Sequence, residues 1–273
     1  DDVQAAAVGS GMCGDGDIHI YLGTSAWVAA VSRTADKFMN GAAAIQSADR
    51  EMNLIAGITE SAGANIQWLQ EQFFSAEKKE YGDKIFEYMD EVIKKIPPGS
   101  NHLICTPWML GERCPVSSTT TRATLFNISM VHTREHLMRA VYEGIGYNLR
   151  WILENYSRDY GFSCDNFRII GGGALDDTWM HIIADITGKC FSVVKDPRNA
   201  GAVGAAVVAL IGLGELPGFS AAKDFVQVER CYEPDPKNRR VYDHLFENYK
   251  RVYNSLKDTY IKANGQRFKG EEE

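Results

Sequence analysis

Residues 167–187 read FRIIGGGALDDTWMHIIADIT, a pattern that predicts a strand leading directly into a helix. Phenylalanine and isoleucine are typical of buried strands, and the apolar spacing after residue 177 is that of an amphipathic helix. Between the two lie three consecutive glycines, Gly171 to Gly173. Bare backbone at such a turn can hold a phosphate or a flat ring, but it can also serve close packing alone. The residues by themselves leave both interpretations open.

A second glycine-bearing turn lies in IHIYLGTSAWVAAV, at residues 18–31. This pattern predicts two strands, 18–22 and 27–31, joined as a hairpin with Gly23, Thr24 and Ser25 at its tip. Backbone N–H groups and hydroxyls at the end of a strand can bind phosphate oxygens. An ordinary hairpin turn is the alternative interpretation.

Helical and strand patterns alternate around these two turns, with no repeat and no long linker. Helices are expected at 61–74, 84–96, 133–154, 200–213 and 243–261, a close-packed helix or turn at 3–12, and further strands at 103–105 and 190–194. The alternation predicts one layered α/β domain over residues 1–273, with a frayed tail at 262–273. The helix at 200–213 is rich in glycine and alanine, as is needed where two backbones approach closely.

The composition excludes several classes of protein. Of the 273 residues 45% are apolar, which is inconsistent with general disorder. The formal net charge is -7, so no nucleic-acid partner is expected, because nonspecific binders are normally basic. No apolar run approaches the roughly 20 residues that span a bilayer, so no membrane association is expected. The six cysteines form no CxxC pair, which favours reduced thiols in a cytoplasmic protein.

Several common site motifs are missing from the chain. The pattern G-x-x-x-x-G-K-[ST] does not occur, so a phosphate site of that type loses its main support. His132, His136 and Glu143 do not have H-E-x-x-H spacing and are expected to be surface residues rather than zinc ligands. No metal ligand is therefore assigned to the chain.

The chain resembles the C-terminal half of the FGGY carbohydrate kinases, members of the sugar kinase/Hsp70/actin superfamily. ATLFNISMVHTREHLMRAVYE at 123–143 follows the long second signature of the family, apart from Asn127 at a glycine position. GGGALDDTWMHIIADITG at 171–188 resembles the adenosine motif of the family, and AGAVGAAVVALIGLG at 200–214 resembles its Gly/Ala helix. LGTSAW at 22–27 resembles its second phosphate loop, and GERCP at 111–115 matches a recurrent loop. The resemblance implies an actin-like (ribonuclease H-like) ATPase domain, with a mixed sheet flanked by helices.

The same resemblance implies roles for individual residues. The catalytic base of the family is an aspartate that precedes a glycine matching Gly9, and it corresponds to Asp2. The family's ATP contacts and their neighbours correspond to Gly23, Thr24, Ser25, Gly63, Gln67, Gly172, Gly173 and Asp177. Both Gly23 and Thr24 are expected to donate to phosphate. If the adenine ring lies against Gly173, a side chain at that position would project into the space of the ring.

By this resemblance the chain is expected to be the ATP-binding half of a sugar kinase that uses ATP and Mg2+. The N-terminal sugar-binding domain is absent from residues 1–273, so the isolated chain is expected to be inactive. LGTSAW and the GER loop favour D-xylulose as the substrate, whereas AGANIQWL leaves glycerol, ribulose and other polyols open. The alternative from another class is a non-catalytic actin-like nucleotide-binding module. Expected partners are ATP, a small sugar or polyol, and the missing N-terminal domain, and a homodimer is left open.

Overall fold

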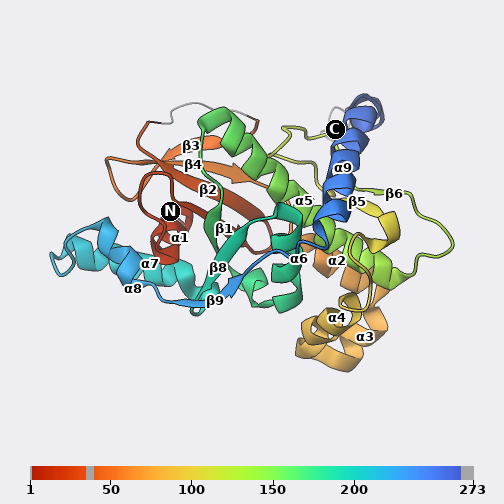
Figure 1. The fold of residues 1–273 in the computed structure, drawn as a ribbon, viewed down its shortest axis with the longest axis horizontal. Helices are drawn as coiled ribbons and strands as arrows, with labels where there is room; N and C mark the ends of the chain where they lie inside the picture. Colours follow the sequence, from red (N-terminus) through yellow and green to blue (C-terminus); the bar gives the residue numbers. More distant parts are fainter. Residues whose placement is uncertain (1, 35–39, 266–273) are drawn as a thin grey trace, which may run out of the picture.

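The computed structural model describes residues 2–34 and 40–265. Within them a mixed seven-stranded sheet has the order β3-β4-β2-β1-β7-β8-β9 (Figure 1). Its strands are β1 (Ile18–Leu22), β2 (Ala26–Ser32), β3 (Ala43–Gln46), β4 (Asn53–Ile58), β7 (Asn166–Ile170), β8 (Cys190–Val194) and β9 (Val228–Tyr232). A separate antiparallel pair consists of β5 (Ile104–Thr106) and β6 (Thr124–Phe126).

The strand directions bring the two glycine-bearing turns together. β1, β7 and β8 run parallel, and the other neighbouring strands of the sheet are antiparallel. Leu22 pairs with Ala26, so the predicted hairpin with residues 23–25 at its tip is confirmed. Because β1 and β7 are parallel neighbours, their carboxyl ends lie at the same edge of the sheet. The turn after each strand therefore lies at that edge.

Helices cover both faces of the sheet (Figure 1). The α-helices are α1 (Asp2–Ser10), α2 (Gly63–Phe73), α3 (Ser75–Tyr81), α4 (Ile85–Ile93), α5 (Arg134–Tyr160), α6 (Asp177–Thr187), α7 (Ala200–Gly212), α8 (Ala222–Phe225) and α9 (Arg239–Asn264). Short 3-10 helices are η1 (Gly82–Lys84), η2 (Ser100–His102), η3 (Gly172–Leu175), η4 (Pro197–Asn199) and η5 (Phe219–Ala221). None of the helices in the described ranges combines the length and the apolar character needed to cross a membrane.

Both faces of the sheet are buried, and alternate residues of its strands face two different hydrophobic cores. Ile18 and Ile20 of β1 belong to a core shared with α5, α6 and α9. Ala29 and Val31 of β2 belong to a second core on the opposite face, shared with α1 and the start of α7. This division follows from the period of two along a strand. The layered α/β fold expected from the sequence is confirmed.

Four strands, two short helices and the end of the chain differ from the sequence-based expectation. The segments for which the sequence predicts no element include β3, β4, β6, β9, α3 and α8. β3 and β4 read AAIQ and NLIAGI, and their alanine and glycine residues have low strand propensity. α9 continues to Asn264, whose side-chain amide donates to the carbonyl oxygen of Thr120 at 2.9 Å. From residue 266 onward the predicted tail lies outside the described residues.

The prediction that His136 and Glu143 lie on the surface is wrong. Both are buried on α5, and Glu143 is only 1% exposed. Its carboxylate accepts hydrogen bonds at 2.8 Å from Arg139 Nε and from the amide of Gly99. Glu143 thus joins α5 to the loop that precedes β5, which is a structural role.

α1 and α7 pack with their backbones in direct contact. A Cβ atom built on Gly204 would lie 1.8 Å from the carbonyl oxygen of Ala5, and one built on Gly9 would lie 1.7 Å from that of Ala200. Both distances are far shorter than van der Waals contact. Only glycine fits at these two positions, which confirms the close approach that the Gly/Ala composition predicts.

Gly204→Ala is expected to lower the free energy of unfolding by about 1–3 kcal/mol or more, because α1 and α7 must separate. Gly201→Ala on the same helix is the matched control, since a Cβ atom there has no neighbour within 4 Å. Removing a helical glycine without a clash should raise stability by about 0.5–1 kcal/mol. Urea unfolding followed by circular dichroism measures both variants. Equal effects of the two substitutions would contradict the backbone contact.

Candidate functional site

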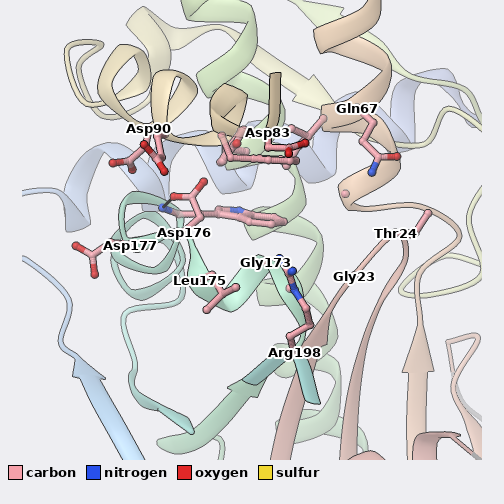
Figure 2. A pocket seen from close by; sticks show the side chains of 17 residues that line it. Gly23, Thr24, Gln67, Asp83, Asp90, Gly173, Leu175, Asp176, Asp177 and Arg198 are labelled. Atoms are coloured by element: carbon pink, nitrogen blue, oxygen red, sulfur yellow. Dashed lines mark hydrogen bonds between the residues drawn. The ribbon is translucent and has the colours of Figure 1, made fainter. Parts of the chain in front are cut away.

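A cavity of about 550 Å³ lies at the edge of the sheet where β1 and β7 end (Figure 2). Its volume is typical of small-molecule sites, which occupy roughly 300–1,000 Å³. The walls come from the hairpin tip, α2, η1, α4, α5, η3, α6 and η4. The predicted residues that line it are Gly23, Thr24, Gly63, Gln67, Gly172, Gly173 and Asp177. Segments far apart in the sequence therefore form one site.

Two of the residues singled out in the sequence do not line this cavity. Ser25 is not part of its wall, and its carbonyl oxygen accepts a hydrogen bond from the amide of Gly23 at 2.9 Å. Asp2 is the exposed first residue of α1, on the opposite face of the sheet from α5 and α6. One of its carboxylate oxygens accepts from the amide of Val3 at 3.0 Å.

Backbone hydrogen bonds fasten the hairpin tip to the start of α2. The amide of Gly63 donates to the carbonyl oxygen of Gly23 at 2.9 Å, and the amides of Ala62 and Ala64 donate to that of Thr24. Because the amide of Gly23 is already bound to Ser25, it is not free to bind a ligand as expected. The amide and hydroxyl of Thr24 have no hydrogen-bond partner within the described residues. Thr24 therefore supplies the donors of this loop.

The three glycines after β7 have different surroundings. Gly171 has a φ of 94°, and a Cβ atom there would lie 2.4 Å from the carbonyl oxygen of Leu22. A Cβ atom on Gly173 would lie 2.7 Å from Cζ3 of Trp179 and 2.8 Å from Cβ of Leu22. Protein atoms, rather than open space for a ring, therefore surround the missing side chain of Gly173. That finding corrects the expectation that a side chain there would enter the ligand space.

Gly172 is the glycine of this turn that has open space beside it. The nearest atom to a Cβ built on Gly172 is Nε of Arg198, at 3.8 Å. Gly172 and Arg198 both line the cavity. A ligand can consequently approach the backbone of Gly172 without displacing protein atoms.

Asp177, the first residue of α6, is positioned by β9. The hydroxyl of Tyr232 donates to Asp177 Oδ1 at 2.6 Å, and Nη1 of Arg230 lies 3.8 Å from the same oxygen. The side chain of Asp177 is nevertheless 57% exposed. Its carboxylate is thus held in one place while it stays accessible to a ligand.

The sequence-based prediction missed the charged residues of the cavity wall. Four carboxylates line the cavity in addition to Asp177, namely Asp83, Glu87, Asp90 and Asp176. Figure 2 shows Asp90 and Asp176 close together at one end of the cavity. No motif marks Asp83, Glu87 or Asp90, because α4 and α6 come together only in the folded chain. Asp176 stands beside Asp177 in the GGGALDDTWM stretch but was not selected as a site residue.

Arg198 is the cavity-lining cation that the sequence did not reveal. Figure 2 shows its side chain pointing toward Gly173, and its guanidinium has no ion-pair partner in the described part of the chain. The turn that presents it is fixed by the amide of Gly171, which donates to the carbonyl oxygen of Pro197 at 2.8 Å. An anionic ligand group is attracted to Arg198 and repelled by the carboxylates, so the charges orient a phosphate-bearing ligand.

The GER loop lies outside the cavity. Glu112 is 4% exposed, and its Oε1 accepts from the amides of Glu60 and Arg113 at 2.7 and 2.9 Å. Burial raises the pKa of Glu112 to about 7, although these donors act in the opposite direction. Arg113 forms an ion pair with Glu60 at 2.7 Å. The loop is thereby braced against the end of β4.

The carboxylates of the cavity are compatible with a magnesium ion shared with a nucleotide. No group of three or more His, Cys, Asp or Glu side chains in residues 2–34 and 40–265 could hold a metal by itself. In phosphoryl-transfer sites Mg2+ is bound by one or two carboxylates together with substrate phosphates, without a dedicated protein cage. In this site Mg2+ would be held mainly by the phosphates and water, and no carboxylate of the described residues is assigned to it.

Known proteins match the chain in sequence and in fold. Residues 18–213 match the C-terminal domain of the FGGY family of carbohydrate kinases. Xylulose kinase of Bacillus subtilis is 30% identical over 260 residues, which are 94% of this chain and 50% of that protein. Gluconokinase of Bacillus licheniformis is 23% identical over 256 residues, 92% of this chain and 50% of that protein. The crystal structure of xylulose kinase from Rhodospirillum rubrum matches with a TM-score of 0.83 and 26% identity, over 95% of this chain and 51% of that one.

The mixed sheet flanked by helices, and its similarity to solved sugar kinase structures, show that the chain has the fold of an actin-like ATPase domain. Within that class, the chain belongs to the FGGY family of carbohydrate kinases. The resemblance seen in the sequence motifs is confirmed. The chain spans about half the length of the curated relatives it matches.

Proposed function

We propose that residues 1–273 are the C-terminal, ATP-binding half of a sugar kinase. The full-length enzyme transfers the γ-phosphate of MgATP to a hydroxyl of a ketopentose, with D-xylulose as the favoured substrate. An N-terminal domain supplies the sugar-binding residues and completes the site. Xylulose kinases among the relatives support this choice of sugar.

One observation carries the proposal. Residues taken from three separate motifs line the same cavity, although Thr24, Gln67 and Asp177 are far apart in the sequence. The hairpin tip and the glycine turn lie side by side because β1 and β7 are parallel neighbours. A nucleotide needs such a convergence of backbone donors, an open glycine and a few fixed polar side chains.

The charges of the cavity indicate how the nucleotide lies. Its phosphates lie toward Thr24 and Arg198, where donors and positive charge are available. Its base lies toward Asp177 and the start of α6, away from the phosphate end. In-line phosphoryl transfer depends mainly on positioning and on electrostatic stabilisation of the transferred group. Asp2 is proposed as the acceptor of the sugar hydroxyl proton, in the arrangement of the full-length enzyme.

A substrate panel tests the proposed function. The full-length protein is assayed with D-xylulose, L-ribulose, glycerol and gluconate, and kcat/KM is expected to be highest for D-xylulose. Gluconate is included because a gluconokinase is among the relatives. Residues 1–273 alone are expected to bind ADP but to phosphorylate none of these compounds. If the full-length protein phosphorylates none of them, and no sugar stimulates ADP release, the proposal is wrong.

Arg198→Ala is expected to raise the KM for ATP by about three- to tenfold, since an exposed ion pair with phosphate is lost. The KM for the sugar should not change. Arg198→Lys keeps the positive charge, so its KM for ATP should lie between those of the wild type and of Arg198→Ala. Steady-state kinetics with ATP and sugar varied separately measure both constants. Arg251→Ala is the matched control, because Arg251 is an exposed arginine of α9 outside the cavity. An unchanged ATP KM in Arg198→Ala would place the phosphates elsewhere.

A further inference from the structure

The signature at 123–143 has little part in the nucleotide cavity, since Tyr142 is its only residue in the cavity wall. Its first part exposes a series of large apolar side chains instead. They are Leu125 and Phe126 of β6 and, beyond that strand, Ile128, Met130 and Val131. Each is at least 40% exposed, and Met130 reaches 105%. We call residues 125–131 the apolar loop.

Hydrogen bonds hold the apolar loop against the turn that precedes β5. Nδ2 of Asn127 donates to the carbonyl oxygen of His102 at 3.1 Å. Nδ1 of His132 accepts from the amide of Ser129 at 2.9 Å, so its Nε2 carries the ring proton and donates to the carbonyl oxygen of Asn101 at 3.2 Å. A segment that is already ordered loses less conformational entropy when it binds. The apolar side chains are therefore presented in a fixed arrangement.

The size and the neutrality of the apolar loop are those of an interface core. A large side chain buries on the order of 150–250 Å2, so five side chains exposed to this extent present roughly 500 Å2. A standard interface buries about 800 Å2 per partner, which the loop and a polar rim around it would supply. No residue of 123–131 is charged, and charged side chains are depleted at interface cores.

The apolar loop lies away from the place where the N-terminal domain joins the chain. Ile104 and Cys105 of β5 belong to the core shared with α5 and α9, whereas α1 belongs to the core on the opposite face of the sheet. Figure 1 shows the N-terminus and β6 far apart. This step rests on the proposed function, because that function places the N-terminal domain at α1. A different partner must cover the apolar loop.

The edge of β6 favours a second copy of the same chain as that partner. β6 reads TLF and pairs only with β5 in its two-stranded sheet. An open edge without charge or proline is a template for another strand. Two copies of β6 can pair antiparallel about a two-fold axis, the commonest symmetry of dimers. Each copy carries a net charge of -7, so a neutral surface is where two copies approach with least repulsion.

We propose that the apolar loop and the open edge of β6 form the interface of a symmetric homodimer. The interface buries Leu125, Phe126, Ile128, Met130 and Val131 of both copies against each other. None of these side chains lines the nucleotide cavity, so each copy keeps its own cavity.

Ile128→Lys and Met130→Lys test the interface in the full-length protein. Lysine at these exposed positions meets water in the monomer, but in the dimer it places a charge in the apolar core of the interface. Sedimentation equilibrium between about 1 and 100 μM should show a wild-type dimer. Each substitution should raise the dissociation constant of the dimer by at least about 30-fold. The melting temperature of the monomer and kcat per chain should not change.

Leu213→Lys is the matched control. Leu213 is an equally exposed leucine at the end of α7, and this variant should dimerise like the wild type. Hydrogen exchange of the wild type gives a readout without any substitution: amides of residues 124–131 should exchange more slowly at 100 than at about 1 μM protein.

A full-length protein that stays monomeric at about 100 μM overturns the proposal. If lysine also lowers the melting temperature of that monomer, the N-terminal domain covers the apolar loop instead. A dimer that neither lysine variant weakens has its interface elsewhere, which also overturns the proposal. A protein that dimerises through the loop but phosphorylates no sugar counts against the proposed function and not against the interface.

Discussion

Asp2→Ala is expected to lower kcat of the full-length kinase by about 100- to 10,000-fold, as removal of a general base typically does. The KM for ATP should change little, because Asp2 lies outside the cavity proposed for the nucleotide. Its exposed position at the start of α1 leaves the carboxylate open to a sugar presented by the N-terminal domain. Steady-state kinetics with saturating ATP and varied sugar measure the loss.

Asp224→Ala serves as the matched control, since Asp224 is an exposed aspartate on α8 outside the cavity. It should leave kcat at the wild-type value. An Asp2→Ala enzyme that retained more than about a tenth of wild-type kcat would show that another group accepts the proton. Asp1 is then the next residue to replace, although it lies outside the described residues.

Gly172→Val is expected to raise the KM for ATP by about tenfold or more and to leave the sugar KM unchanged. The added side chain projects into the cavity beside Arg198 and takes the place of the nucleotide. Apart from the adjoining residues of the turn, no described protein atom lies closer than 3.8 Å to the new Cβ atom, so the melting temperature should stay close to that of the wild type. Kinetics with the two substrates varied separately, together with thermal unfolding, measure these effects.

Gly173→Val gives the contrasting result expected of a structural glycine. Its Cβ atom meets Trp179 and Leu22 at less than van der Waals distance, so the variant should lose about 1–3 kcal/mol of stability or more. Both substrates should then be affected together through partial unfolding. If Gly172→Val remained folded and bound ATP normally, the nucleotide would not lie against this turn.

The elements that carry strong local patterns could be predicted from the sequence. The strands around Ile20 and Ile169 are rich in β-branched residues, and the expected helices at 61–74, 84–96, 133–154, 177–187 and 243–261 have regular apolar spacing; helices are found in all five segments. β3 and β4 could not be found in this way, because their alanines and glycine form strands only by pairing, β4 with β2 and β3 with β4. Local propensity was too weak there, and tertiary pairing decided the structure.

In the candidate site, too, only the residues that lie in local sequence motifs could be predicted. Thr24, Gly172 and Asp177 lie in motifs of continuous sequence, and motif resemblance sufficed to place them in one cavity. Asp90 and Arg198 lie in segments without such motifs. Arg198 follows Asp196, which has a left-handed φ of 51°, a conformation that residue type alone does not reveal. Charges brought in by tertiary contacts were therefore not predictable.

The contact between α1 and α7 also limits which substitutions this part of the chain can accept. On α7, Ala200, Gly204 and Val207 are buried, whereas Gly201 lies in open space. A survey of all single substitutions should thus find an intolerant stripe with helical period, beside positions that accept almost any residue. Because α1 begins at Asp2, the packing of α1 against α7 at Gly9 and Gly204 also fixes the position from which the Asp2 carboxylate projects.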